Sequence, residues 1–469
     1  MSRIFSLPEL LQNLKALDYN CPDEISFDGT NINSKKIQSG NIFFAIKGNK
    51  VDGHDFVKNA FDNGAKICII DHFTPTIVGN KFPYILVENV RENLFVLAKY
   101  CRKTFKGKII ALTGSAGKST TKNWLFEILK NFKKTFSTYK NQNTDIGSAL
   151  TLTNCEQDVE FCVMELGMST RGEISASSKL IEPNIALILN IKPVHIENFN
   201  SLLEIAQEKS DIVDGLKKNS AIFVNREETP FEKIVEYINS KNKNVKIFSF
   251  GKNENCDCLL KSFQLQDENI FVNASILGND IDFFLQNVGE QFISSTLAIL
   301  GIAKYLDLFE QEVVKKLNDL HLYPGAGEIS EIKTSQGKIK IIDETHNANP
   351  ASVIWAIKKL SAIEGKRKIA VLGAMYELGD YLQQGLDEVL KSLLENKIDL
   401  VFTCGKEIKY LFDKLPAKIQ GKHCDEVETK ILDDVVNGGD IFLVKGSHGV
   451  NLKKGRMYGF VEKLCSFAS

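Results

Sequence analysis

The feature that most constrains this chain is a short glycine-bearing loop between an apolar run and an amphipathic segment. Residues 108–112 suit a buried strand, and the helix-like pattern after the loop places Trp124, Leu125 and Phe132 on one side. A loop of this kind turns backbone N–H groups toward the positive end of a helix, where phosphate oxygens are held. Lysine and serine at its end suit the outer phosphates and Mg²⁺. We therefore predict a nucleotide site made of Thr113, Gly114, Ser115, Ala116, Gly117, Lys118, Ser119 and Thr120.

The loop is a shortened version of the full phosphate-loop pattern. Leu112 stands where the first glycine of that pattern is expected, which leaves the form Thr-Gly-Ser-x-Gly-Lys-Ser-Thr. A Gly-Lys-Ser triplet also arises by chance. Its place between a buried-strand pattern and an amphipathic helix favours nucleotide binding over chance.

The composition excludes several other classes of protein. With 469 residues the chain should form two to four domains. A formal net charge of -1 gives no electrostatic footprint for nucleic acid or an anionic membrane, and no apolar run is long enough to span a bilayer. The N-terminus lacks the pattern of a signal peptide, and the 10 cysteines lack the spacing of a zinc site. We expect a cytoplasmic protein with reduced thiols.

Alternating strand and helix patterns predict an α/β protein of three domains. We expect a small N-terminal domain at residues 1–104, a central mostly parallel P-loop-type sheet with the ATP site at 105–323, and a Rossmann-like domain at 324–469. Residues 324–327 carry the clearest linker signal. Residues 245–284 look β-rich and irregular, with Cys256 and Cys258 in turns.

Two polar residues follow apolar runs of the central domain, as the phosphate loop does. Glu165 ends the run at 159–164, and His195 lies beyond the run at 185–190. Ligands of open α/β sheets sit beyond the carboxyl ends of strands, so both should share one edge with Ser119 and complete a divalent-cation site. Either residue alone is more often a solvated loop residue or a helix cap.

A lysine lies on the apolar stripe of the next helix. Residues 201–204 form a capping box, and Lys209 falls on the stripe between Ile205 and Ile212. An inward lysine normally extends its ammonium to solvent, but it can also point into a site as a reactive amine with a lowered pKa. Glu208 and Asp211, on more exposed faces, look like ordinary solvated charges.

Motifs along nearly the whole chain resemble the Mur ligase family, and most closely its branch that adds D-alanyl-D-alanine to a UDP-muramoyl tripeptide. Residues 34–37, 40–43 and 52–54 are similar to the family's UDP-sugar-binding module, although residues 52–55 taken alone are more often merely a turn with a helix cap. The phosphate loop is similar to the family's ATP loop. The discriminating stretches are residues 141–147, 165–167, 172–174, 347–350, 377–379 and 445–447.

This resemblance implies an ATP-dependent ligase that forms an amide bond through an acyl phosphate in peptidoglycan precursor synthesis. It implies ATP and two Mg²⁺ ions, with Ser119 and Glu165 on one ion and His195 on the other, and catalytic roles for Lys118 and a carbamylated Lys209. The substrates would be UDP-N-acetylmuramoyl-tripeptide and D-Ala-D-Ala, and the protein a monomer. It places Asp343 and Asn347 at ATP, and Ser34, Asp52, Gly53, His54, Asn143, His346 and Asn349 at the substrates.

The chain also departs from the family's pattern. Ala326 stands where an arginine is expected to touch phosphate, which bears on the rate of phosphoryl transfer. The alternatives are a family member that adds the third peptide residue or polyglutamylates folate, and a nucleotide-binding homologue with weak or no catalysis. The other departures are Asn33, Lys35, Thr144, Gln291, Ser295, His346 and Ala374.

Overall fold

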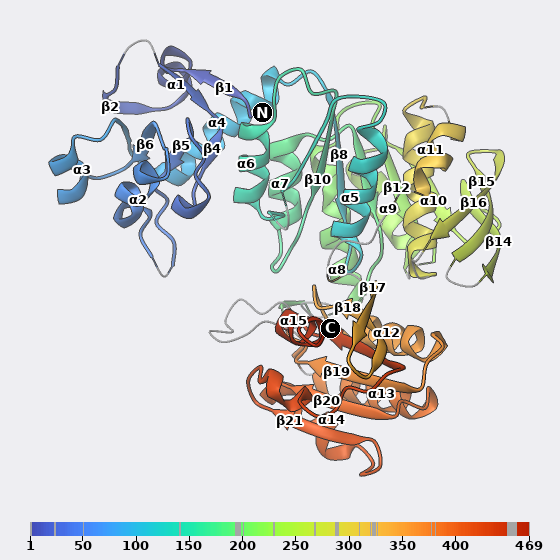
Figure 1. Cartoon of the computed structure of the whole chain (residues 1–469). Coiled ribbons are helices and arrows are strands. Elements are labelled where there is room, and N and C mark those ends of the chain that lie inside the picture. Colours follow the sequence, from blue (N-terminus) through green and yellow to red (C-terminus); the bar gives the residue numbers. More distant parts are fainter. Residues whose placement is uncertain are drawn as a thin grey trace. The chain divides into compact units, whose positions relative to one another are not determined.

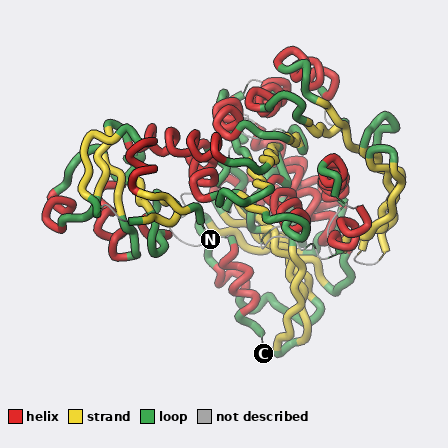
Figure 2. Tube along the Cα trace, turned by 90° about the horizontal axis from the view of Figure 1, so that it is seen from above, coloured by secondary structure: helices red, strands yellow, loops and turns green. Residues whose placement is uncertain are grey.

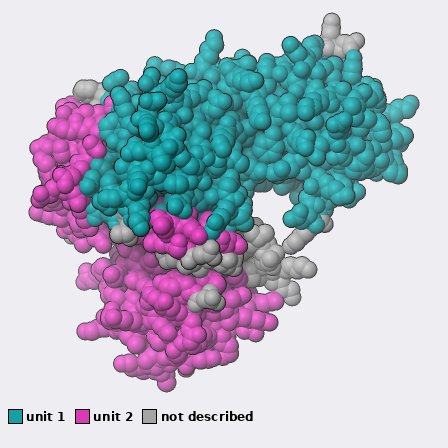
Figure 3. Space-filling model, turned by 180° about the vertical axis from the view of Figure 1, so that it is seen from behind, with its two compact units in different colours: residues 1–190, 206–250, 305–308 teal, residues 191–205, 251–304, 309–469 magenta. Residues whose placement is uncertain are grey.

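The structure, a computed structural model, divides into two compact units, coloured separately in Figure 3. Unit 1 comprises residues 1–190, 206–250 and 305–308, and unit 2 comprises residues 191–205, 251–304 and 309–469. The structure describes residues 2–22, 25–49, 51–139, 142–192, 198–199, 201–227, 230–266, 269–286, 290–308, 310–318, 320, 325, 327–376, 378–379, 381–447 and 457–468.

Unit 1 begins with a small α/β sheet in the strand order β2-β7-β6-β5-β4, with β2 antiparallel and the others parallel. Its cluster of buried residues includes Phe43, Val57, Cys68 and Ile70. The elements are β1 (Ile4–Ser6), α1 (Leu7–Asn13), β2 (Ala16–Asn20), β3 (Ser26–Asp28), β4 (Thr30–Asn31), β5 (Ile42–Phe44), α2 (Val57–Asp62), β6 (Ile67–Ile70), α3 (Pro75–Asn80), β7 (Tyr84–Val87) and α4 (Val90–Thr104).

The second sheet region of unit 1 has its strands in the order β13-β12-β11-β8-β10-β9, all paired in parallel. Its central strands are buried along almost their whole length, as a parallel sheet covered by helices requires. The elements are β8 (Lys108–Thr113), α5 (Lys118–Leu129), β9 (Thr135–Ser137), α6 (Asp145–Asn154), β10 (Phe161–Glu165), α7 (Glu173–Ile181), β11 (Ile185–Ile188), α8 (Leu202–Ser210), η4 (Asp211–Gly215), β12 (Ala221–Asn225), α9 (Phe231–Lys241) and β13 (Lys246–Gly251).

From residue 251 on, the chain forms an antiparallel meander followed by two helices. Strand β15 pairs with β14 and β16, and its residues alternate between buried and half-buried. The region is therefore more regular than expected, and the prediction that Cys258 lies in a turn is wrong, because this buried residue begins β14. The elements are β14 (Cys258–Gln266), β15 (Asn269–Ile276), β16 (Asn279–Gln286), α10 (Gln291–Tyr305) and α11 (Glu310–Leu317).

The rest of unit 2 is a sheet in the order β17-β18-β22-β19-β20-β21, parallel except for β17. Alternate residues of β19 belong to two different clusters, with Ala370 and Leu372 in one and Ile369 and Val371 in the other, so both faces are buried. The elements are β17 (Glu328–Thr334), β18 (Gly337–Glu344), α12 (Pro350–Ala362), β19 (Arg367–Gly373), α13 (Tyr381–Glu395), β20 (Leu400–Cys404), α14 (Lys409–Lys414), β21 (Gln420–Cys424), β22 (Asp440–Lys445) and α15 (Tyr458–Cys465).

The α/β prediction and the mostly parallel central sheet are thus confirmed, and Figure 2 shows helices and strands together in the fold. Among the residues that the structure describes, no helix has the length and apolar character needed to cross a bilayer.

Candidate active site

The phosphate loop lies where the sequence predicted it, between β8 and α5 (Figure 1). Gly117 caps α5 with a positive φ of 76°, and having no side chain it leaves the first-turn N–H groups of the helix open to an anion. A Cβ atom built on Gly117 would meet none of the described residues within 4 Å, so none of them closes this side of the loop. The Lys118 ammonium folds back across the loop and donates to the Gly114 carbonyl at 2.8 Å. These features fit a bound polyphosphate.

Asn190, at the end of β11, holds the loop in this shape. Its Oδ1 accepts hydrogen bonds from the Ser115 N–H (3.0 Å) and the Ala116 N–H (2.8 Å). Its Nδ2 donates to the Ala116 carbonyl at 2.9 Å. The sequence analysis did not single out Asn190 as a functional residue, because a single asparagine after a strand has no distinctive pattern.

A hydroxyl and a carboxylate meet beside the loop. Ser119 Oγ donates to Glu165 Oε2 at 2.8 Å, and Asn143 Nδ2 donates to Glu165 Oε1 at 2.9 Å. Glu165 is the last residue of β10, which pairs in parallel with β8, and it is 2% exposed. Hydroxyl and carboxylate oxygens are the donors that Mg²⁺ prefers, so this pair fits a Mg²⁺ site next to phosphates. Asn143, predicted at the substrate, here contacts the carboxylate.

A buried lysine lies close to this pair. Lys122, one turn after Ser119 on α5, is 1% exposed and donates to the Thr138 carbonyl at 2.8 Å. Burial lowers its pKa, against the opposing effect of the Glu165 charge. The sequence analysis did not single out Lys122, because one lysine within a helical pattern has no distinctive spacing.

Lys209 points inward. Of the two orientations that the sequence left open, the structure shows the buried one, with the side chain 2% exposed. Burial, together with the positive charge of Lys118, holds the pKa of Lys209 well below its ordinary value, and the Glu208 carboxylate opposes this shift. Burial likewise lowers the pKa of Lys118. A lowered pKa favours the neutral, nucleophilic form of the amine.

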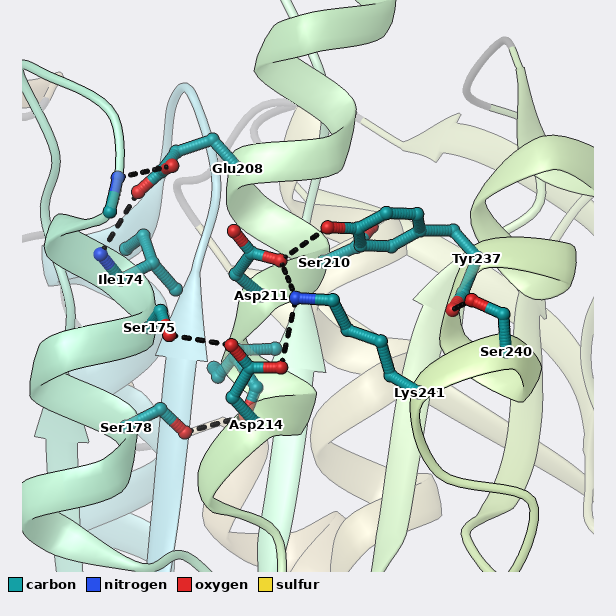
Figure 4. A network of polar contacts seen from close by, with 12 residues as sticks. Ile174, Ser175, Ser178, Glu208, Ser210, Asp211, Asp214, Tyr237, Ser240 and Lys241 are labelled. Carbon is teal, nitrogen blue, oxygen red and sulfur yellow. Dashed lines mark hydrogen bonds and ion pairs between the residues drawn. The ribbon is translucent and has the colours of Figure 1, made fainter.

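The prediction that Glu208 and Asp211 are ordinary solvated charges is wrong. Glu208 is 4% exposed and accepts hydrogen bonds from the backbone of the neighbouring helix α7 (Figure 4). Asp211 accepts a hydrogen bond from the Tyr237 hydroxyl at 2.7 Å and pairs with Lys241. The helix α8 also ends earlier than the apolar stripe, because residues 211–215 form a 3-10 turn.

In the N-terminal sheet region, the predicted substrate residues form a compact loop. Asp52 caps the 3-10 turn Gly53–Phe56 by accepting the His54 N–H, so the helix-cap alternative describes its local structure. A Cβ atom on Gly53 would lie 2.6 Å from the Ala45 carbonyl carbon, so the loop packs closely on β5. Ser34, at the start of the 3-10 turn Ser34–Lys36, is buried.

His54 is completely buried in this loop, and both ring nitrogens have neighbours. Its Nδ1 lies 2.7 Å from Asp52 Oδ1, and its Nε2 accepts the Asp71 N–H at 3.2 Å. Asp52, His54 and His72 have ligand atoms close enough to hold a metal ion. Because the contacts of His54 are already made within the protein, we assign no metal to this group.

In unit 2, the predicted residues cluster after β18. Asp343 Oδ1 accepts hydrogen bonds from the N–H and hydroxyl of Thr345, and Asn349 caps α12 in a reciprocal capping box with Ser352. Lys445, 2% exposed, pairs with Glu344 at 2.9 Å and donates to the Asn347 carbonyl at 3.0 Å. His346 follows directly in this loop. His195 and Ala326 lie outside the described residues.

Comparisons with known proteins agree with this geometry. The description "Mur ligase family, catalytic domain" matches residues 26–102, "Mur ligase middle domain" matches 112–303, and "Mur ligase, glutamate ligase domain" matches 330–448. A curated relative from Rickettsia prowazekii (strain Madrid E), "UDP-N-acetylmuramoyl-tripeptide--D-alanyl-D-alanine ligase", is 32% identical over 94% of this chain and 96% of its own length.

Solved structures give the same picture. A crystal structure of MurF from Acinetobacter baumannii superposes with a TM-score of 0.84 at 25% identity, covering 99% of both chains. The MurF ligase from Thermotoga maritima in complex with ADP gives a TM-score of 0.77 at 28% identity, covering 94% of this chain and 98% of the other.

Proposed function

Because the chain belongs to the Mur ligase family and is an ATP-dependent, amide-bond-forming ligase, we propose that it joins D-alanyl-D-alanine to UDP-N-acetylmuramoyl-tripeptide. The observation that carries the proposal is the meeting of Ser119 and Glu165 at the end of a phosphate loop that ends in Lys118. The names of the relatives, which match over nearly the whole chain, supply the substrates and favour this reaction over the addition of a third residue.

The residues at and beside the phosphate loop have roles that follow from their charges and hydrogen bonds. Ser119 and Glu165 would hold one Mg²⁺, and His195 a second. Bound there, Mg²⁺ neutralises phosphate charge that would otherwise repel an incoming carboxylate. Lys118 adds its positive charge to the outer phosphates, and Asn190 keeps the loop N–H groups in position.

The reaction needs two steps of bond formation. The tripeptide carboxylate attacks the γ-phosphorus and forms an acyl phosphate as ADP leaves. The free amine of the dipeptide then attacks the acyl carbon and phosphate leaves, so that one amide forms for each ATP. The remaining predicted residues would bind the substrates. Asp343 and Asn347 would contact ATP, and His346 and Asn349 would contact the acceptor. The UDP-sugar would be bound by Ser34, Asp52, Gly53 and His54.

Lys209 would act as its carbamate. Burial that lowers the pKa of a lysine favours its neutral amine, and a neutral amine can add to carbon dioxide with loss of a proton, giving a carboxylate-like group. Such a group supplies oxygen ligands where an unmodified lysine would repel a cation. We further propose a monomer acting in the cytoplasm; the ten cysteines all lie in the described part of the chain and none forms a disulfide, in keeping with a reducing compartment.

The test is phosphate release from ATP with defined acceptors. We expect release that requires both UDP-muramoyl tripeptide and D-Ala-D-Ala. Release with a UDP-muramoyl dipeptide and lysine or meso-diaminopimelate, and none with the tripeptide and D-Ala-D-Ala, would instead assign the chain to third-residue addition. No release above background with any acceptor would leave a nucleotide-binding homologue without catalysis.

A further inference from the structure

Glu208 makes contacts that the reaction alone does not explain. It precedes Lys209 on α8 and is 4% exposed, although glutamate is rarely buried without a partner. Its Oε2 accepts the Gly172 N–H at 2.7 Å and its Oε1 accepts the Ile174 N–H at 3.0 Å (Figure 4). Both oxygens of the carboxylate are therefore used on the backbone of a different helix.

The N-terminus of α7 needs such a partner. Gly172 occupies its N-cap position with a φ of 86° and has no side chain to accept the first N–H groups of the helix. A carboxylate at this end also interacts favourably with the helix dipole. Glu208 thus serves as the cap of α7, supplied from α8.

Further contacts join the same two segments beyond Glu208. Ser175 Oγ donates to Asp214 at 2.5 Å, and Ser178 Oγ donates to the Ile212 carbonyl at 2.5 Å. A Cβ atom on Gly215 would lie 1.9 Å from the Ser178 carbonyl oxygen, so only glycine allows this approach. The segment that carries Lys209 is therefore fixed along α7, which follows β10 and Glu165 in the chain.

Asp211 provides a natural contrast. It lies two residues after Lys209, as Glu208 lies one before, but it contacts Tyr237 and Lys241 of α9 instead of α7 (Figure 4). Glu208 and Asp211 carry the same charge, but Glu208 contacts α7 whereas Asp211 contacts α9.

We propose that Glu208 is a positioning residue, which holds Lys209 buried beside the phosphate loop by capping α7 from α8. The catalytic consequence rests on the role proposed above for Lys209. Without the cap, the first N–H groups of α7 would have to hydrogen-bond to water. The turn of α8 that bears Lys209 would lose the two charge-assisted hydrogen bonds that join it to α7.

The first experiment measures how well Lys209 is protected. The full-length wild type, Glu208→Gln and Asp211→Asn are treated with an amine-acetylating reagent, and acetylation of Lys209 is followed by peptide mass spectrometry with the exposed Lys58 as internal reference. A glutamine can accept only one of the two N–H groups and turns its own NH₂ toward the other. We expect Lys209 to be acetylated about tenfold faster or more in Glu208→Gln, as the loss of a charge-assisted hydrogen bond implies, and to remain protected in Asp211→Asn.

The second experiment separates positioning from general destabilisation. In the acceptor-dependent phosphate assay, Glu208→Gln should lower kcat about 10- to 100-fold, as is common for groups that orient an active-site residue, while KM for ATP stays unchanged. Glu208→Asp keeps the charge with a shorter reach and should give an intermediate kcat. Thermal unfolding of each variant checks that it is folded, and Glu208→Asp takes the place of Glu208→Gln in the acetylation experiment if the latter does not fold.

The outcomes are distinct. Unchanged acetylation of Lys209 in Glu208→Gln, or equal acceleration in Asp211→Asn, would overturn the positioning role. If the wild type shows no acceptor-dependent phosphate release, the proposed function fails, and the acetylation result still decides whether Glu208 holds Lys209.

Discussion

The contact between Asn190 and the phosphate loop gives a prediction that can be worked out from the structure. Asn190→Ala removes two hydrogen bonds accepted by Oδ1 and one donated by Nδ2, all to residues Ser115 and Ala116. Each such bond contributes about 0.5–1.5 kcal/mol. The Ser115 N–H also donates to the Asn190 backbone carbonyl at 3.0 Å, which the variant keeps. Because of this, and because water can replace part of the loss at a half-buried site, we take the low end of the sum, about 1.5 kcal/mol. If the loop must be ordered to bind phosphate, ATP binding should weaken about tenfold.

The chain offers a matched control for this variant. Asn184 stands just before β11, as Asn190 stands just after it, and its Oδ1 accepts the Ile109 N–H at 2.9 Å. It is also half-buried, but it contacts the start of β8, at the opposite end of that strand from the phosphate loop. The Kd of ATP, measured by isothermal titration calorimetry, should rise in Asn190→Ala and stay unchanged in Asn184→Ala. Equal Kd values in the two variants would refute the loop-ordering argument.

Three further predictions concern the same part of the fold. Glu165→Gln keeps the shape of the side chain but removes the charge proposed to hold Mg²⁺, so kcat should fall about 100-fold or more with little change in Tm; wild-type turnover would exclude Glu165 from the metal site. Lys209→Ala should nearly abolish phosphate release, with partial rescue by a short carboxylic acid, and full activity in that variant would refute the carbamate. Burial raises the pKa of Asp214, but hydrogen bonds from Ser175 and Lys241 outweigh it, so the pKa of the folded state is lowered. The Asp214 carboxylate therefore stabilises the fold above the unfolded pKa of about 4, and this stabilisation is lost as the pH falls through the folded pKa. The difference in Tm between wild type and Asp214→Asn should therefore be largest near neutral pH and shrink below about pH 4; a difference that does not change with pH would contradict this linkage.

Local patterns in the sequence were sufficient for the main elements of the site. An apolar run, a glycine loop and an amphipathic helix predict that Lys118 and Ser119 begin a helix after a buried strand, as the structure has them, because these features depend on neighbours in the chain. Glu165 follows from the rule that parallel strands share a carboxyl edge, and Lys209 from its place on a helical stripe. In each case, the residue's own strand or helix determines where it points.

Residues that depend on a different element could not be found in this way. Glu208 looked exposed because a helical pattern takes no account of the uncapped N-terminus of α7 against which it lies. Asn190 contacts backbone groups of the phosphate loop, and Lys122 contacts the Thr138 carbonyl. Contacts of this kind produce no recognisable residue spacing in the sequence. The regular meander at β14–β16 was missed because Cys258 and its polar neighbours suggested a turn. The roles of the site residues stay predictions until variants are measured.

The most direct test of the central claim is the mass of the product. Purified protein would be incubated with ATP, Mg²⁺, UDP-muramoyl tripeptide and D-Ala-D-Ala, and the UDP-linked product analysed by mass spectrometry. The account predicts a tripeptide precursor extended by one dipeptide, with one ADP and one phosphate formed for each molecule of product. Hydrolysis of ATP with an unextended precursor, or extension by a single amino acid, would contradict it.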